Sequence, residues 1–175
     1  MFKVIAIAGS LRQVSINKTL LKAAVLLAPE GMEITLYEGI GQLPHFNPDL
    51  EYPDSVKAFQ NQIKSADGLI ISSPEYAHGV PGTLKNALDW LVGGSEMVNK
   101  PVALLSASTR SQIAQESLVE ILKTMSAHVV SEASVGFDLL GQNKTEVDIA
   151  KDPVLSVRLK RALARFKKAI KRAKG

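Results

Sequence analysis

Five short apolar runs dominate the sequence, and each is followed by a stretch whose apolar residues recur at helical spacing. The runs are too short and too continuous for surface strands, so they predict strands that are buried on both faces. Strands that alternate with helices are typical of a doubly wound α/β domain with a parallel sheet. The predicted strands are 4–8, 32–37, 68–73, 102–105 and 129–135.

Helices are predicted after each of these strands. The predicted helices are 18–28, 55–65, 82–91, 112–126 and a last one over 155–170. Asn17 is expected to cap the first helix and Asp54 the second, because both side chains can accept a hydrogen bond from a first-turn amide. The stretches 39–52 and 136–152 are expected to be irregular loops.

The alternation predicts a flavodoxin-like fold: a five-stranded sheet in the order 2-1-3-4-5 with helices on both faces. We expect the 175 residues to form a single domain, because apolar residues make up 46% of the chain and charged residues 22%. In such a sheet, ligands bind beyond the carboxyl ends of the strands, at the point where the strand order reverses. That point lies between strands 1 and 3, so the loops after these two strands are the candidate site.

The loop after the first strand contains polar residues that suit an anion. Ser10, Arg12, Ser15 and Asn17 lie between a buried strand and the start of a helix. Hydroxyl groups and the free N–H groups of a helix N-terminus can surround a phosphate, and a guanidinium can neutralise it. The loop therefore predicts a phosphate site.

The loop after the third strand suits a flat ring. Pro74 stiffens the backbone, which can then offer a rigid edge of N–H and C=O groups, and Tyr76 can form an aromatic wall. A mononucleotide with a planar ring would occupy both loops.

Several other sites are not indicated. The chain has no G-x-G-x-x-G fingerprint and no P-loop, and it has no nucleophile elbow. Cysteine is absent, and the three histidines, His45, His78 and His128, lack the spacing of zinc ligands. The absence of cysteine fits a reducing compartment, and no signal peptide or membrane span is recognisable, so we expect a cytoplasmic protein.

Two motifs resemble the NADPH-dependent FMN reductase family, a flavodoxin-like group that includes chromate, quinone and azo-dye reductases. The motifs are GSLRQVSIN after the first strand and SPEYAHGVPGTLKNALDWL after the third, and the resemblance runs from Phe2 to about Val135. It implies bound FMN, with NAD(P)H as co-substrate. The FMN-binding residues that it implies are Ser10, Leu11, Arg12, Ser15, Ile16, Asn17, Pro74, Glu75, Tyr76, Ala77 and Ser106.

The sequence departs from the family pattern at two places. Ala77 stands where the family commonly has Asn, and the loop after the fourth strand reads SASTRSQ where relatives often have several glycines. We expect Ala77 to lose a side-chain contact to FMN while the backbone contacts are kept, and the bulkier side chains of the SASTRSQ loop to narrow the site or change the acceptor.

The resemblance implies that FMN passes a hydride from NAD(P)H to a small acceptor: a quinone, a free flavin, an azo compound or chromate. No side chain is assigned as catalytic. It also implies a homodimer or homotetramer. Two alternatives remain open from the sequence: an FMN electron carrier without NAD(P)H oxidase activity, and a non-redox interaction module.

Charge is unevenly distributed along the chain. Nine Lys and Arg residues lie between Arg158 and Lys174 with no acid among them, whereas the rest carries 12 basic and 17 acidic residues, a net charge of −5. We interpret the basic stretch as the solvent-facing side of the last helix, and we expect no nucleic-acid or membrane partner.

Overall fold

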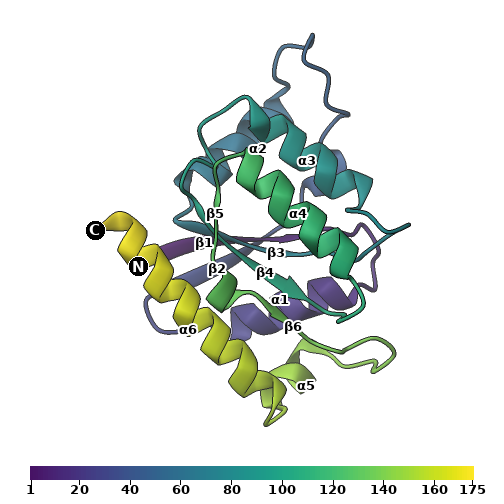
Figure 1. Cartoon of the computed structure of the whole chain (residues 1–175), viewed down its shortest axis with the longest axis vertical. Helices are drawn as coiled ribbons and strands as arrows, with labels where there is room; N and C mark the ends of the chain where they lie inside the picture. The colour runs from purple at the N-terminus through teal and green to yellow at the C-terminus, as the bar shows by residue number, and fades with distance from the viewer.

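A computed structural model describes residues 1–175 as a parallel sheet between two layers of helices (Figure 1). The strand order is β2-β1-β3-β4-β5, as the sequence predicted. The strands are β1 (Phe2–Ala8), β2 (Met32–Tyr37), β3 (Gly68–Ser72), β4 (Pro101–Ser106), β5 (His128–Val129) and β6 (Val135–Gly136). The α-helices are α1 (Ile16–Leu26), α2 (Asp54–Ser65), α3 (Gly82–Val92), α4 (Gln112–Thr124), α5 (Glu146–Lys151) and α6 (Leu155–Lys174). None of these helices combines the length and the apolar character needed to cross a lipid bilayer.

Both faces of the sheet are covered, which explains why the strands are apolar without alternation. In β1, Val4 and Ala6 belong to the apolar cluster under α1, α5 and α6, whereas Ile7 belongs to the cluster under α2, α3 and α4. In β4, Ala103 and Leu104 divide between the two clusters in the same way. Each strand therefore buries successive side chains on opposite sides.

The sequence predicted one continuous fifth strand over 129–135, and this prediction is wrong. It is split into β5 and β6 by a 3-10 turn, η2 (Ser131–Ala133). The cause is Ser134: its hydroxyl accepts a hydrogen bond from the Leu104 N–H at 3.0 Å and donates one to the Val130 carbonyl at 3.0 Å. A side chain thus replaces one backbone partner of β4, and the chain rejoins the sheet only at β6.

Both predicted helix caps are wrong. Ser15, not Asn17, caps α1, because its side chain accepts from the Lys18 N–H at 3.4 Å. Asn17 lies in the first turn. The second helix begins at Asp54 itself, with Pro53 in the cap position and no side-chain cap.

The stretch 136–152 is not wholly irregular, because it contains α5. Thr145 and Asp148 form a capping box there: the Thr145 hydroxyl accepts from the Asp148 N–H, and the Asp148 carboxylate accepts from the Thr145 N–H at 2.9 Å. A Thr followed three residues later by an acid is a helix-start signal that the sequence displays. The helix is one and a half turns long, so its apolar periodicity is too short to recognise.

Asp67 joins the amino end of β1 to the end of α6. Its carboxylate accepts a hydrogen bond from the Lys3 N–H at 2.8 Å and forms an ion pair with Lys174. Partial burial alone would raise the pKa of Asp67, but these two hydrogen bonds, with the charges of Lys174 and Lys100, lower it below its ordinary value.

We expect Asp67→Asn to lower the free energy of unfolding by about 1–2 kcal/mol at pH 7. Because the pKa of Asp67 is lowered in the folded state, its contribution is present above about pH 4 and is lost as the pH falls through the folded value. Urea unfolding from pH 7 to pH 3 should show the two proteins converging. Asp49→Asn, a change at an exposed loop carboxylate with no hydrogen bond or ion pair in the protein, should leave the stability unchanged at every pH.

Candidate functional site

A cavity of about 190 Å³ lies at the carboxyl edge of the sheet, where the loops after β1, β3 and β4 meet. It is the place that the strand order predicted for a ligand. The residues that line it are Ser10, Arg12, Ser15, Ile16, Asn17, Pro74, Glu75, Tyr76, Ala107, Ser108, Ser111 and Leu140.

The structure brings together the first eight of these, all of which the sequence singled out, and leaves three others outside the cavity lining. Leu11 is 61% exposed and packs against Gly41. Ala77 lies in a turn beyond Tyr76. Ser106 ends β4, and its hydroxyl donates to the Ser108 carbonyl at 2.6 Å.

Four lining residues were not singled out. Ala107, Ser108 and Ser111 follow β4, where the resemblance implied Ser106 and its neighbours; the neighbours line the cavity and Ser106 does not. The bond between Ser106 and Ser108 closes a short turn that directs the next residues to the cavity. Leu140 comes from the loop after β6, where no sequence signal indicated a contact.

The start of α1 supplies donors to the cavity. Ser15 caps the helix, and the N–H groups of Ile16 and Asn17, the first two of the helix, have no acceptor within it. Both residues line the cavity, as does Arg12. An anion placed here would meet a guanidinium, two free amides and the positive end of the helix dipole.

Asn17 is held in one orientation. Its Oδ1 accepts a hydrogen bond from the buried hydroxyl of Ser72 at 2.9 Å. The side-chain amide nitrogen has no partner in the protein, although the residue is only 6% exposed. The amide is therefore left as a donor in the wall of the cavity.

Gly9 allows the first loop to turn directly against β3. Its N–H donates to the Ser72 carbonyl at 2.8 Å. A Cβ atom at Gly9 would lie 2.7 Å from Ser73 Oγ and 3.0 Å from Leu84 Cδ2, so a side chain would push the loop away from the strand.

The loop after β3 is fastened to α4 by Glu75. One carboxylate oxygen accepts from the Ala114 N–H, in the first turn of α4, at 2.9 Å, and the other lies 3.2 Å from Nδ1 of His78. A carboxylate at a helix N-terminus is stabilised by the helix dipole. Glu75 thus fixes the loop by its side chain and leaves the backbone of Pro74–Tyr76 at the cavity.

The two loops also touch directly. The hydroxyl oxygens of Ser10 and Tyr76 lie 3.4 Å apart. Tyr76 lines the cavity and is 48% exposed, so one side of its ring faces solvent at the cavity mouth.

The residues after Tyr76 form a tight turn in a strained conformation. Tyr76 and Gly79 exchange two backbone hydrogen bonds, at 2.9 and 3.1 Å, and the two residues between them have positive φ: 49° at Ala77 and 57° at His78. Two positive φ values define a type I′ turn, which favours Asn or Gly. Ala77 therefore has a backbone conformation that Asn, the residue common in the family pattern, would adopt more easily.

We expect Ala77→Asn to stabilise the protein by about 0.5–1 kcal/mol, because Asn tolerates a left-handed backbone better than Ala does. The measurement is the free energy of unfolding in urea. Ala77→Val is the matched opposite: a β-branched side chain at positive φ should destabilise the protein by at least about 1 kcal/mol. If both variants matched the wild type, the turn would not be strained.

In the second half of the motif SPEYAHGVPGTLKNALDWL, Asn86 and Trp90 have a structural role that the sequence did not reveal. Asn86 accepts from the Phe46 N–H at 2.7 Å and donates to the Pro44 carbonyl at 2.9 Å. The Trp90 indole donates to the same carbonyl at 2.8 Å, and the Phe46 ring meets its edge. These two residues of α3 therefore hold the long loop 43–53 rather than a ligand.

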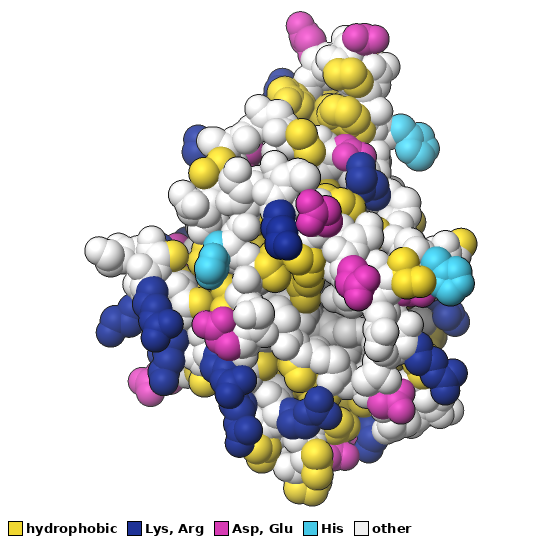
Figure 2. Space-filling view, in the orientation of Figure 1, with side chains coloured by type: hydrophobic (Ala, Val, Ile, Leu, Met, Phe, Trp, Pro, Cys, Tyr) yellow, Lys and Arg dark blue, Asp and Glu magenta, His cyan; other side chains and the backbone are white.

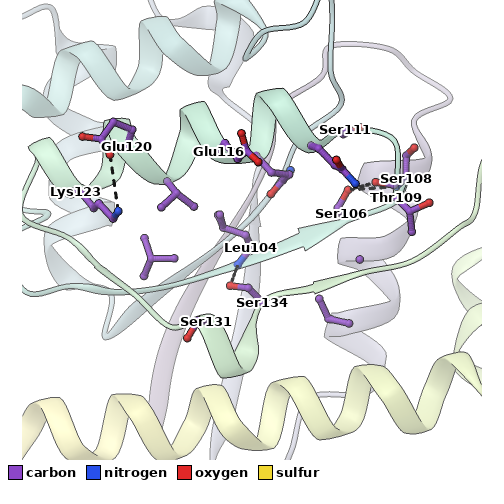
Figure 3. A pocket seen from close by; sticks show the side chains of 16 residues that line it. Leu104, Ser106, Ser108, Thr109, Ser111, Glu116, Glu120, Lys123, Ser131 and Ser134 are labelled. Carbon is purple, nitrogen blue, oxygen red and sulfur yellow. Dashed lines mark hydrogen bonds and ion pairs between the residues drawn. The ribbon is translucent and has the colours of Figure 1, made fainter.

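A larger groove of about 790 Å³ runs beside α4, between this helix and β5–β6 (Figure 3). It shares Ser108 and Ser111 with the smaller cavity. The carboxylates of Glu116 and Glu120 line it, and its one lysine, Lys123, lies 3.8 Å from Glu120. A groove with more negative than positive charge does not suit a phosphate, so the smaller cavity is the candidate site.

The order of the strands and a cavity at the reversal point define a flavodoxin-like α/β protein with a candidate ligand site at its sheet edge. The family model for NADPH-dependent FMN reductase matches residues 2–140. The chain belongs to this family, which makes it an NAD(P)H-dependent flavin oxidoreductase and decides against the electron-carrier alternative.

Individual relatives agree. The chain is 37% identical over 155 residues to an NAD(P)H-dependent FMN reductase of Pseudomonas aeruginosa, covering 80% of this chain and 83% of that protein. It is 36% identical to a quinone reductase of Escherichia coli, over 61% of this chain and 60% of that protein. Among solved structures, the flavoenzyme NAD(P)H:(acceptor) oxidoreductase FerB of Paracoccus denitrificans superposes with a TM-score of 0.81 at 26% identity, covering 99% of both chains.

Proposed function

We propose that the 190 Å³ cavity holds the phosphate end of FMN. The single observation that carries this proposal is the convergence of Arg12, the free first-turn amides of α1 and the unpartnered amide of Asn17 on one cavity. Ser10 and Ser15 add hydroxyl groups. These are the donors that a phosphate dianion requires, so the residues present fit the cofactor.

The flavin ring is assigned to the edge formed by Pro74, Glu75 and Tyr76. The cavity is smaller than the roughly 300–1,000 Å³ of a typical ligand pocket, so only part of FMN can lie inside it. Glu75 and Ser10 hold this edge in place through Ala114 and Tyr76. A fixed backbone edge positions a ring without a reacting side chain.

FMN, when bound, supplies the hydride transfer between NAD(P)H and an acceptor. The tasks of this chain are to anchor the cofactor by its phosphate, to hold the ring edge, and to leave the ring open to a second molecule beside the half-exposed Tyr76. No side chain is assigned a proton-transfer role. We propose a quinone as the acceptor, because several curated relatives are named quinone reductases.

Arg12→Ala tests the phosphate site. A charge-assisted hydrogen bond is worth about 1.5–3 kcal/mol, so the FMN dissociation constant should rise about tenfold or more. The measurement is titration of the apoprotein followed by flavin fluorescence. Arg110→Ala is the matched control: Arg110 is exposed in the loop after β4 and lines neither cavity.

Unchanged FMN affinity in Arg12→Ala would show that the phosphate lies elsewhere. Failure of the wild-type protein to take up FMN at micromolar concentration, or to oxidise NADPH in the presence of a quinone, would overturn the proposed function itself.

We further propose a homodimer or homotetramer whose contact lies at the cavity mouth. Large apolar side chains on the site loops and on the first turn of α4 are exposed: Leu11 at 61%, Val14 at 85%, Leu140 at 52% and, in α4, Ile113 at 49%. Exposed apolar residues gathered around a site favour a protein contact. Sedimentation velocity should show a dimer or larger species, and Val14→Asp should dissociate it; a monomeric wild type would contradict the proposal.

We also propose that the whole chain is a single FMN-binding domain. The supporting observation is that α6 contributes Phe166 and Ile170 to the same apolar cluster as Val4 of β1. The cytoplasmic location stays a prediction from the sequence.

A further inference from the structure

The nine basic residues of α6 fall into two groups. Four on the flanks of the helix are bound to the body of the protein. Arg158 donates to the Gly136 carbonyl at 2.8 Å and Arg165 to the Glu132 carbonyl at 3.1 Å. Lys167 donates to the Glu30 carbonyl, and Lys174 pairs with Asp67.

The other five have no hydrogen bond or ion pair within the protein, and all five are exposed. We call them the basic ridge: Lys160, Arg161, Lys168, Lys171 and Arg172. With 100° of rotation per residue, they fall within an arc of about 120° around the helix axis. The four basic residues that bind the body of the protein lie on either side of this arc. Along the axis the ridge extends over about 18 Å. Figure 2 shows Lys and Arg side chains along the path that α6 takes in Figure 1.

The ridge differs from the ordinary solvent-facing side of an amphipathic helix, although the sequence alone led us to that interpretation and to expect no membrane partner. Lys168 lies one turn from both Lys171 and Arg172, and like charges at this spacing destabilise a helix. An ordinary exposed face would intersperse acids, but α6 contains none. The rest of the chain has a net charge of −5, so the positive charge is concentrated on this one surface.

We propose that the basic ridge docks the protein on a membrane surface rich in anionic phospholipid. Five unpartnered cations on one side of the helix are complementary in charge to such a surface, and each contributes to the attraction. Because the apolar side of α6, including Phe166 and Ile170, is buried in the core, the helix cannot insert. It lies flat, and binding depends on charge alone.

The composition of the ridge favours a lipid surface over a nucleic acid. The only other exposed side chains within the arc are Val157 and Ala164. Nucleic-acid surfaces also use Ser, Thr, Asn, Gln and aromatic side chains for hydrogen bonds and stacking, and the ridge has none. Anionic lipid headgroups diffuse in the plane of the membrane, so positive charge on the ridge is sufficient to collect them beneath the helix.

Co-sedimentation of the full-length protein with vesicles tests the proposal. We expect binding to vesicles of equal parts phosphatidylglycerol and phosphatidylcholine at about 0.1 M salt, and its loss at about 0.5 M, where charges are screened. Pure phosphatidylcholine should not bind. Lys168→Gln with Lys171→Gln should weaken partitioning about 25-fold, since each cation near an anionic surface contributes about fivefold.

The matched control is Lys57→Gln with Lys64→Gln, which removes the same charge from α2 on the opposite layer. It should bind as the wild type does. Both double variants should retain NADPH oxidation, and removing the repulsion between Lys168 and Lys171 should leave the thermal unfolding temperature at or slightly above that of the wild type. Inorganic phosphate at constant ionic strength should not release the protein, because the ridge needs many headgroups together.

Three results would overturn the proposal: no binding to the anionic vesicles at about 0.1 M salt, equal loss in both double variants, or tighter binding to a DNA duplex than to the vesicles in the same buffer. None of them depends on FMN binding, so failure here and failure of the proposed reductase function can be told apart.

Discussion

The close contact between the first loop and the end of β3 is the constraint on which the site depends. The Gly9 amide bonds to the Ser72 carbonyl, and the Ser72 hydroxyl bonds to Asn17. One short strand end therefore fixes both the loop and the first turn of α1. The strand order reverses between β1 and β3, which are neighbours in the sheet. The loops that follow these two strands therefore lie side by side, and Tyr76 comes within reach of Ser10.

The fold could be predicted largely from the sequence. Strands buried on both faces appear there as uninterrupted apolar runs, and the helices between them appear as apolar residues that recur at helical spacing. What could not be predicted depends on single side chains that replace backbone partners. Ser134 takes the Leu104 amide and splits the last strand. Ser15 takes the cap position expected for Asn17. Hydrogen bonds of this kind leave no periodic trace.

The sequence predicted which loops form the site, but it did not predict every residue that lines the cavity. Eight predicted residues line the cavity, since a polar loop after a buried strand can point only to the sheet edge. Ser106 and its neighbours were expected to close the site, and the bond from Ser106 to Ser108 turns the chain so that the neighbours Ala107 and Ser108, and not Ser106, line the cavity. Leu140 arrives from a segment remote in sequence, which only the tertiary structure reveals.

The anchoring of loop 43–53 by Asn86 and Trp90 has a consequence for how distant relatives are recognised. The L-K-N-A-x-D-W segment, taken with P-E-Y, resembles a cofactor signature, yet the three hydrogen bonds of Asn86 and Trp90 to loop 43–53 all end at Pro44 or Phe46. A chain that kept this segment would preserve the loop's anchorage even after losing the flavin. Searches for functional kin should therefore weight the residues after β1 above those of α3.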